Sequence, residues 1–298
     1  LASRDGTVGA ARAAVDEDGT VGASRRRVLV VNTGGTMGMR PTPTGLAPSA
    51  GYLRERIGAM EELTFEAMPD VHVHDFDPLL DSADFSPDEW VAIASTIEDR
   101  YLAYDGFVVV MGTDTLAYCA SALAFMLENL GKPVILTGSQ IPLCDAFSDA
   151  RRNLIASVLF AAALTGAFHN EVAVCFGEAL LRGCRATKLR ALDLRAFDSP
   201  NFPPLATLGV RIRLNVELAR PPALGPLIVH KAMDTRVIVV LLVPGFDDSA
   251  LERLCSQPGL RALVLEFYGV GSAPTRRAGL LNALALCRQN GILVVAVT

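Results

Sequence analysis

The hydrophobic pattern of the chain is clearest over residues 106–128. Residues 107–111 form an unbroken apolar run, short enough for a strand that is buried on both faces of a parallel sheet covered by helices. A polar turn at 112–115 follows. Apolar residues then recur at three- and four-residue steps, which predicts one face of a helix: Leu116, Ala120, Leu123, Ala124 and Leu127. Ligands of open α/β sheets bind beyond the carboxyl ends of strands, so Thr113 and Asp114 are candidate site residues.

Strand and helix patterns alternate along the chain on both sides of this stretch, which predicts an α/β fold with a doubly wound parallel sheet. A helix begins at Ser86, where the motif Ser-Pro-Asp-Glu forms a capping box with proline at the first helical position, and it extends to about Tyr101. Glycine and arginine in 177–188 indicate a hairpin or loop that carries Arg182, Arg185 and Lys188. The other predicted elements are strands at 27–32, 71–76, 133–136 and 172–176 and a helix at 148–164.

The domain organisation follows from where these patterns stop. Residues 1–26 repeat the hexapeptide DGTVGA without a helical or strand period and are predicted to be a disordered tail. An N-terminal α/β catalytic domain is expected over 27–211, with irregular structure from 189 onward because prolines replace the periodic pattern. A linker over 212–226 and a C-terminal α/β domain over 227–298 complete the chain.

The C-terminal domain is predicted to be incomplete. Its last strand has no covering helix after it, and a parallel strand that is bare on one face is unusual. Its expected elements are strands at 227–230, 237–242, 262–267 and 292–297 and helices at 247–255 and 274–289.

Composition narrows the possible partners and the compartment. The chain has 298 residues, of which 51% are hydrophobic, and a net charge of -5, so it can bury a large core and carries no basic footprint for nucleic acid. Its six cysteines include no C-x-x-C pair, as in a protein from a reducing compartment. We find neither a membrane span of roughly 18 uncharged apolar residues nor a signal-peptide core, and therefore expect a cytoplasmic protein with a small-molecule substrate.

Two threonine-containing turns are the main candidates for chemistry. Residues 33–36 (TGGT) and 112–115 (GTDT) each follow an apolar strand, so both can face the same crevice. A threonine hydroxyl is a weak nucleophile that needs a base or a nearby cation, and Lys188 is a candidate for that role. The alternatives are ordinary ones: helix N-caps for the threonines and a solvated loop charge for the lysine. The proline-bearing segment 39–50 is predicted to be a surface loop long enough to act as a lid.

Other kinds of site are weakly supported. The glycines of the first turn match neither the P-loop nor the dinucleotide-binding fingerprint. His72 and His74 lie on one strand face, but no third metal ligand is evident, which favours ordinary strand histidines. These residues therefore give only weak support to a phosphate-binding loop or a metal site.

Eight motifs resemble those of the L-asparaginase family, especially its cytosolic type I branch, which includes the asparaginase domain of animal enzymes. They are collinear across 27–298: TGGTMG at 33–38, DSADFSPDEW at 81–90, GFVVVMGTDT at 106–115, MLENLGKPVILTGSQIP at 126–142, SDARRNL at 148–154, RGCRATK at 182–188, SPNFPPLATLG at 199–209 and YGVGSAPT at 268–275. The resemblance implies a larger N-terminal and a smaller C-terminal α/β domain. It also implies a homodimer or homotetramer, if the C-terminal domain is complete, in which the partner completes the active site. No metal and no cofactor are implied.

The resemblance further implies hydrolysis of L-asparagine to L-aspartate and ammonia through an ester on a threonine. Thr36 matches the nucleophile. Thr113 and Lys188 match the pair that handles protons, while Asp114 matches the residue that also holds the substrate α-ammonium. Ser82 matches a residue that binds the α-carboxylate.

Several positions depart from the family pattern. Met111 stands where many members have histidine, Cys184 where asparagine is common, and Ala83 where a polar residue follows the serine. Ser272 replaces an asparagine that reaches the partner's site, and Leu46 replaces the lid tyrosine of bacterial members. Two alternatives therefore stay open: a catalytically impaired asparaginase-like binding or partner protein, and a glutaminase-asparaginase. Related amidotransferase subunits share the threonines but normally carry an added N-terminal domain. The residues do not settle the preference for asparagine over glutamine, or allosteric control.

Overall fold

The computed structural model describes residues 13–15, 21–23, 25–43, 45–163 and 170–298. It divides into two compact units, Leu1–Lys231 and Ala232–Thr298. The first unit holds two hydrophobic cores and the second holds one. Within the described residues, no helix combines the length and the apolar content needed to cross a membrane. Most of the predicted disordered tail, 1–26, lies outside the described residues. Two short strands inside it, β1 (Ala13–Val15) and β2 (Val21–Ala23), pair antiparallel, which the sequence pattern did not predict.

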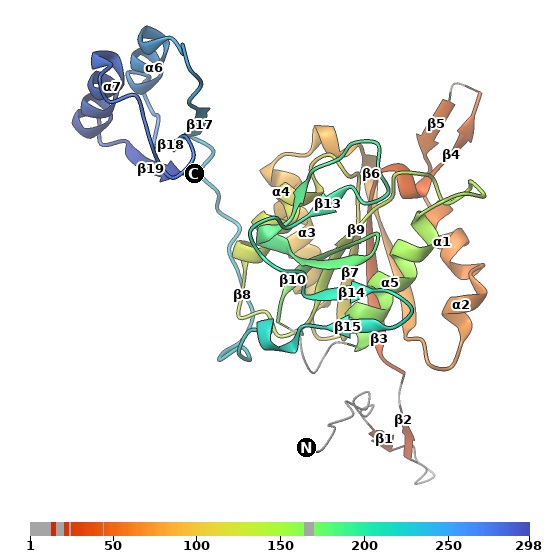
Figure 1. Ribbon diagram of the computed structural model, residues 1–298. Helices are drawn as coiled ribbons and strands as arrows, with labels where there is room; N and C mark the ends of the chain where they lie inside the picture. The colour runs from red at the N-terminus through yellow and green to blue at the C-terminus, as the bar shows by residue number, and fades with distance from the viewer. Residues whose placement is uncertain (1–12, 16–20, 24, 44, 164–169) are drawn as a thin grey trace. The chain divides into compact units, whose positions relative to one another are not determined.

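The first unit is built on an eight-stranded sheet (Figure 1) with the order β15-β14-β11-β10-β9-β7-β3-β6. Neighbouring strands from β10 to β6 run parallel, and the β11, β14 and β15 pairings are antiparallel. The predicted α/β class is therefore confirmed. The parallel strands are β3 (Arg27–Gly34), β6 (Asp70–Leu80), β7 (Gly106–Val110), β9 (Val134–Thr137) and β10 (Val172–Phe176).

Helices cover both faces of this sheet, as the continuous apolar strands require. Alternate residues of β3 enter different cores, Val28 with Val30 on one face and Leu29 with Val31 on the other. The first core includes residues of α1 (Tyr52–Gly58), α2 (Glu61–Thr64) and α5 (Ala150–Ala163). The second includes residues of α3 (Pro87–Arg100) and α4 (Leu116–Met126), and Figure 1 shows these two sets of helices apart.

Two predicted local features can be compared directly with the structure. The capping box of α3 is present, because the Ser86 hydroxyl accepts a hydrogen bond from the Asp88 N–H and Glu89 accepts one from the Ser86 N–H. Residues 39–50, predicted to be a loop, instead contain a hairpin of β4 (Met39–Thr42) and β5 (Gly45–Pro48). The difference arises because prolines are tolerated in such edge strands, so their presence did not exclude pairing.

The proline-rich region 189–226 is more regular than predicted. Short strands β13 (Phe197–Asp198), β14 (Ala206–Leu208) and β15 (Ile212–Leu214) lie within it, and the last two extend the main sheet next to β11 (Ala179–Arg182). Strands of two or three residues carry no periodic pattern, which is why the sequence did not reveal them. The 3-10 helix η4 (Val216–Leu218) follows.

The boundary between the units, after Lys231, lies beyond the predicted linker 212–226. Residues 227–230 were assigned to the second domain, yet β16 (Ile228–Val229) pairs with β8 (Leu127–Glu128) in the first unit. The Lys231 ammonium also lies 2.6 Å from the Glu98 carboxylate on α3. These contacts hold the segment to the first unit.

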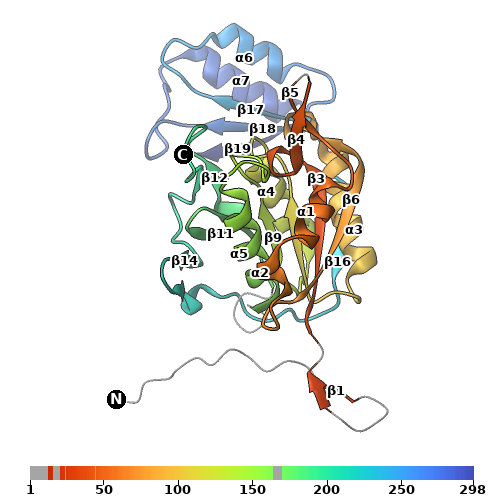
Figure 2. The ribbon, with the colours of Figure 1, turned by 90° about the vertical axis from the view of Figure 1, so that its right-hand side faces the viewer.

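The second unit is a three-stranded parallel sheet with helices on one face. The strands are β17 (Val237–Leu241), β18 (Ala262–Glu266) and β19 (Leu293–Val297), and the helices are α6 (Asp248–Cys255) and α7 (Ala278–Gln289). Figure 2 shows α6 and α7 on the same side of the three strands. Leu263 and Leu265 are fully buried beneath these helices, whereas Val239, Leu241 and Leu293 are more than half exposed.

Candidate active site

The two threonine turns of the sequence meet at their backbones. Gly34 and Gly35 both have positive φ, 121° and 83°, a region that favours glycine. A Cβ at Gly35 would lie 2.3 Å from the Gly112 nitrogen, so the two turns touch with no room for a side chain. Thr36 follows at the start of the 3-10 helix η1 (Thr36–Gly38) and is half-buried.

The second turn makes direct contact with the predicted lysine. The Lys188 ammonium donates hydrogen bonds to the Thr113 hydroxyl at 2.8 Å and to the Asp114 carboxylate at 2.5 Å. Lys188 lies in β12 (Thr187–Lys188), which pairs antiparallel with β13. The Lys188 side chain is 17% exposed, whereas that of Asp114 is 70% exposed. The lysine is therefore fixed by its partners, while the carboxylate is open to a ligand.

Gln140 is a contact that the sequence analysis missed. Its side-chain oxygen accepts a hydrogen bond from the Thr113 hydroxyl at 3.4 Å, and its amide nitrogen donates to the carbonyl oxygens of Ala191 and Asp193. The Asp149 carboxylate in turn accepts a hydrogen bond from the Gln140 N–H. The available signal was the polar turn 137–140 after a strand, the same pattern that identified Thr113.

Ser82 lies against the second turn. It is 1% exposed, and of the described residues none forms a hydrogen bond with its hydroxyl. A Cβ at Gly112 would lie 2.5 Å from this hydroxyl oxygen, and the Ser82 carbonyl accepts a hydrogen bond from the Thr115 hydroxyl at 2.7 Å. A buried hydroxyl without a partner costs free energy, which a polar ligand at this position would recover.

The remaining predicted site residue, Ser272, lies in the second unit. Its backbone exchanges hydrogen bonds with Tyr268, which closes a turn in which Gly269 and Gly271 have positive φ. Taken with the contacts above, the structure brings Thr113, Asp114 and Lys188 together. Ser82 lies against Gly112 of the same turn, and Thr36 follows Gly35, which touches Gly112.

The positions that depart from the family pattern have different surroundings. Met111 is fully buried in the core, and Leu46 in β5 is 50% exposed. The Cys184 thiol, in the 3-10 helix η3 (Gly183–Arg185), is 3.9 Å from the Arg220 guanidinium. Ala83 follows Ser82 in the 3-10 helix η2 (Ser82–Asp84), and its N–H donates to the Asp81 carboxylate.

The histidine pair has ordinary partners. His72 contacts the Tyr104 hydroxyl at 3.0 Å and the Asp70 carboxylate at 2.9 Å through its two ring nitrogens. His74 packs edge-on against Phe76, and burial lowers its pKa. Over the described part of the chain, no three His, Cys, Asp or Glu side chains lie close enough to hold a metal ion.

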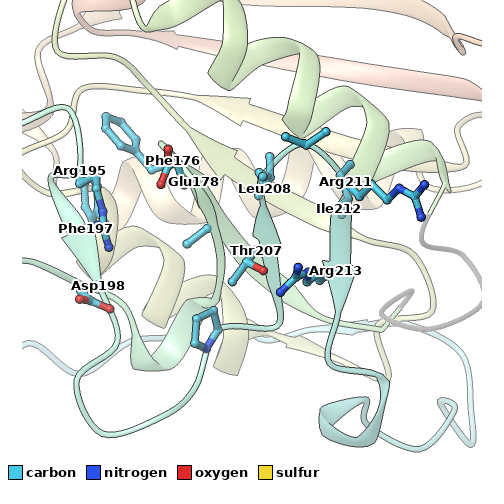
Figure 3. Close-up of a pocket in the computed structure, with 14 residues that line it drawn as sticks. Phe176, Glu178, Arg195, Phe197, Asp198, Thr207, Leu208, Arg211, Ile212 and Arg213 are labelled. Carbon is cyan, nitrogen blue, oxygen red and sulfur yellow. The ribbon is translucent and has the colours of Figure 1, made fainter.

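A cavity of about 810 Å³ lies elsewhere in the first unit, over the antiparallel end of the sheet (Figure 3). Arg195, Phe197, Thr207 and Arg213 line it, and none of the predicted site residues does. Phe197, which forms part of its wall, is nevertheless paired with Lys188 across strands β12 and β13. This cavity is therefore separate from the candidate site, although it adjoins the hairpin that carries the lysine.

Comparison with known proteins gives consistent matches. The family model described as "Asparaginase, N-terminal" matches residues 27–220. L-asparaginase 1 of Escherichia coli K12 is 44% identical over 276 residues, covering 92% of this chain and 79% of that protein. The 60 kDa lysophospholipase of Mus musculus is 41% identical over 92% of this chain, which spans 51% of that longer protein.

A solved structure agrees with these matches. The crystal structure of L-asparaginase I from Vibrio cholerae superimposes with a TM-score of 0.83 at 37% identity. The match covers 90% of this chain and 80% of the other.

Proposed function

The chain belongs to the L-asparaginase family, and on that basis we propose that it hydrolyses the side-chain amide of L-asparagine to L-aspartate and ammonia. One observation carries the proposal: the Lys188 ammonium contacts both Thr113 and Asp114 beside the turn that holds Thr36. This arrangement supplies a hydroxyl nucleophile, a proton path and a carboxylate within one site.

In the first half of the reaction, the Thr36 hydroxyl oxygen attacks the amide carbon of the substrate. The C–N bond breaks, the hydroxyl proton leaves with the nitrogen as ammonia, and the acyl group stays on Thr36 as an ester. The N–H groups of the turn at Thr113 would stabilise the oxyanion of the tetrahedral intermediate.

In the second half, a water molecule attacks the ester. The Thr113 hydroxyl, which is hydrogen-bonded to Lys188 at 2.8 Å, accepts a proton from that water while it gives its own proton to the Thr36 oxygen. The C–O bond to Thr36 then breaks, which releases aspartate. The role of Lys188 is to favour the deprotonated threonine by its positive charge.

Substrate binding uses groups of opposite charge. The exposed Asp114 carboxylate would accept hydrogen bonds from the α-ammonium, and the buried Ser82 hydroxyl, which no described residue engages, would donate to the α-carboxylate. Ser272 is proposed to contribute from the second unit of a partner copy. We propose a cytoplasmic homodimer or homotetramer without a cofactor, on the strength of the family resemblance.

The test is ammonia release from L-asparagine by the chain, its Thr36→Ala variant and its Thr36→Ser variant. We expect Thr36→Ala to reduce kcat by at least a thousandfold, on the order of 4 kcal/mol of transition-state stabilisation, with KM little changed. Thr36→Ser keeps a hydroxyl oxygen and should retain measurable activity, which separates loss of the nucleophile from local misfolding.

Two outcomes would contradict the proposal. Equal activity of Thr36→Ala and the parent chain would mean that Thr36 is not the nucleophile. Asparagine binding without ammonia release would support the alternative of a non-catalytic binding protein. L-glutamine assayed in parallel would show whether the protein is instead a glutaminase-asparaginase.

A further inference from the structure

Asn32 is a buried polar residue near the carboxyl end of β3, directly after four apolar residues. It follows Val28 to Val31 in β3 and is 1% exposed. In the sheet it lies opposite Asp75 on β6 and Val110 on β7. A buried amide costs free energy unless it is hydrogen-bonded, so its contacts indicate the role of this residue.

Both the oxygen and the nitrogen of the Asn32 side-chain amide form hydrogen bonds. Its Oδ1 accepts a hydrogen bond from the Gly34 N–H at 3.2 Å, which closes a turn around Thr33. Its Nδ2 donates to Asp75 Oδ1 at 2.8 Å. A Cβ at Gly38 would lie 3.9 Å from Asn32 Oδ1. The amide therefore lies against Gly34 and Gly38, which are two residues before and two residues after Thr36.

Asp75 connects this amide to a helix. Its second oxygen, Oδ2, lies 3.2 Å from the Arg54 guanidinium, which also donates to the Val73 carbonyl at 3.1 Å. Arg54 is in α1, which follows the β4–β5 hairpin, and the neighbouring Leu53 Cβ would lie 3.7 Å from a Cβ at Gly38. The contacts Asn32–Asp75–Arg54 thus join β3, β6 and α1 around the turn that carries Thr36.

We propose that Asn32, oriented by Asp75 and Arg54, is a positioning residue that sets the place of the Thr36 hydroxyl. This inference rests on the proposed function. Gly34 and Gly35 have positive φ and no side chain of their own, so they allow the turn without fixing it. The Asn32 amide supplies the restraint from one side and the contact of Gly35 with Gly112 from the other. A shift of about 1 Å in a reacting group can cost about a hundredfold in rate.

The test replaces Asn32 by leucine, which has a similar volume and no hydrogen-bonding atoms. We expect Asn32→Leu to lower kcat for asparagine by about ten- to a hundredfold with KM within about threefold, since Asp114 and Ser82 still bind substrate. Hydrogen–deuterium exchange of the amides of 33–38 should become faster. The matched control is Asn215→Leu, which removes a half-buried amide that donates to the Pro204 carbonyl at 2.6 Å, between β15 and η4. That variant should keep the parent kcat.

A second variant keeps the inference testable if Asn32→Leu does not fold. Asp75→Asn removes the charge that holds Arg54 but leaves an oxygen for Asn32, and we expect a smaller loss of kcat, about three- to tenfold. An unchanged kcat in a folded Asn32→Leu variant, or equal losses in Asn32→Leu and Asn215→Leu, would overturn the inference. If the parent chain releases no ammonia, the proposed function fails. The hydrogen–deuterium exchange of the amides of 33–38 then tests the restraint by itself: faster exchange in Asn32→Leu supports it, and unchanged exchange refutes it.

Discussion

At the scale of single residues, the site depends on a position where only glycine fits. Gly35 combines a φ of 83° with a backbone contact to Gly112 that a Cβ would enter at 2.3 Å. Gly51 has a similar φ of 76°, but nothing lies within 4 Å of a Cβ placed there. Comparing alanine substitutions at Gly35 and Gly51 therefore separates the free-energy cost of a left-handed backbone conformation from that of steric overlap.

We predict that Gly35→Ala destabilises the first unit by about 3 kcal/mol, because strain and overlap add. Gly51→Ala should cost only about 1 kcal/mol, since it carries the strain alone. Urea unfolding of both variants measures the difference. Folded Gly35→Ala protein should also have lost most of its asparaginase activity, because the turns can no longer touch. Equal stabilities for the two variants would show that the contact with Gly112 does not matter.

At the scale of elements, α3 illustrates how a local motif operates independently of the sheet. The Ser86 hydroxyl and the Glu89 carboxylate satisfy N–H groups at the helix start, at distances of 3.2 Å and 2.6 Å. The hydrogen bonds from Ser86 lower the pKa of Glu89 below its usual value of 4.5. The stabilisation by this carboxylate is therefore complete above about pH 4.5 and is lost as the pH falls through the lowered pKa.

We predict that Ser86→Ala reduces the free energy of unfolding by about 1 kcal/mol at neutral pH. The control in the same helix is Thr96→Ala, which removes a hydroxyl that only donates back to the Ala92 carbonyl and should change stability little. Chemical denaturation at pH 7 and at pH 3 tests the sign. The gap between parent and Ser86→Ala should narrow as the pH falls toward and through the lowered pKa of Glu89, and a gap that widens would contradict the linkage.

At the scale of the whole molecule, three separate cores, two in the first unit and one in the second, account for the state of the buried cysteines. Cys119 and Cys175 are buried in the first unit, and Cys255 and Cys287 are buried together between α6 and α7. Burial raises the pKa of Cys175 and that of Cys255 to about 12, and it raises the pKa of Cys119 as well. Only Cys144 and Cys184 are partly exposed. Since the thiolate is the reactive form, the four buried cysteines should be unreactive in the folded protein.

We predict that Ellman's reagent modifies two thiols of the native protein quickly and all six after denaturation without reductant. The fast pair should be Cys144 and Cys184, and a Cys144→Ser, Cys184→Ser double variant should leave no fast reaction. Fewer than six reactive thiols after denaturation would reveal a disulfide, against the reducing compartment that the sequence indicates. Fast reaction of a third thiol in the native state would show that one of the cores opens.

The extent to which the sequence alone was informative follows the length of each pattern. The strand and helix around the second threonine turn were predicted closely, because β7 and α4 are long enough to show a period and are buried where the pattern requires. The capping box of α3 was likewise predicted from the sequence, because its residues Ser86 and Glu89 are only three positions apart. Strands β13 to β15 were missed, since two or three residues carry no period and gain their stability from neighbours in the sheet.

The sequence by itself determined the α/β class, the glycine and hydroxyl turns after β3 and β7, and the family to which they point, since each of these depends on residues close together in the chain. Only the tertiary structure decided which distant groups meet. Lys188 reaches Thr113 across 75 residues, and Asn32 reaches Asp75 across 43 residues. Such contacts arise from sheet order and strand register, which bring residues together irrespective of their separation in sequence, and no local pattern encodes them.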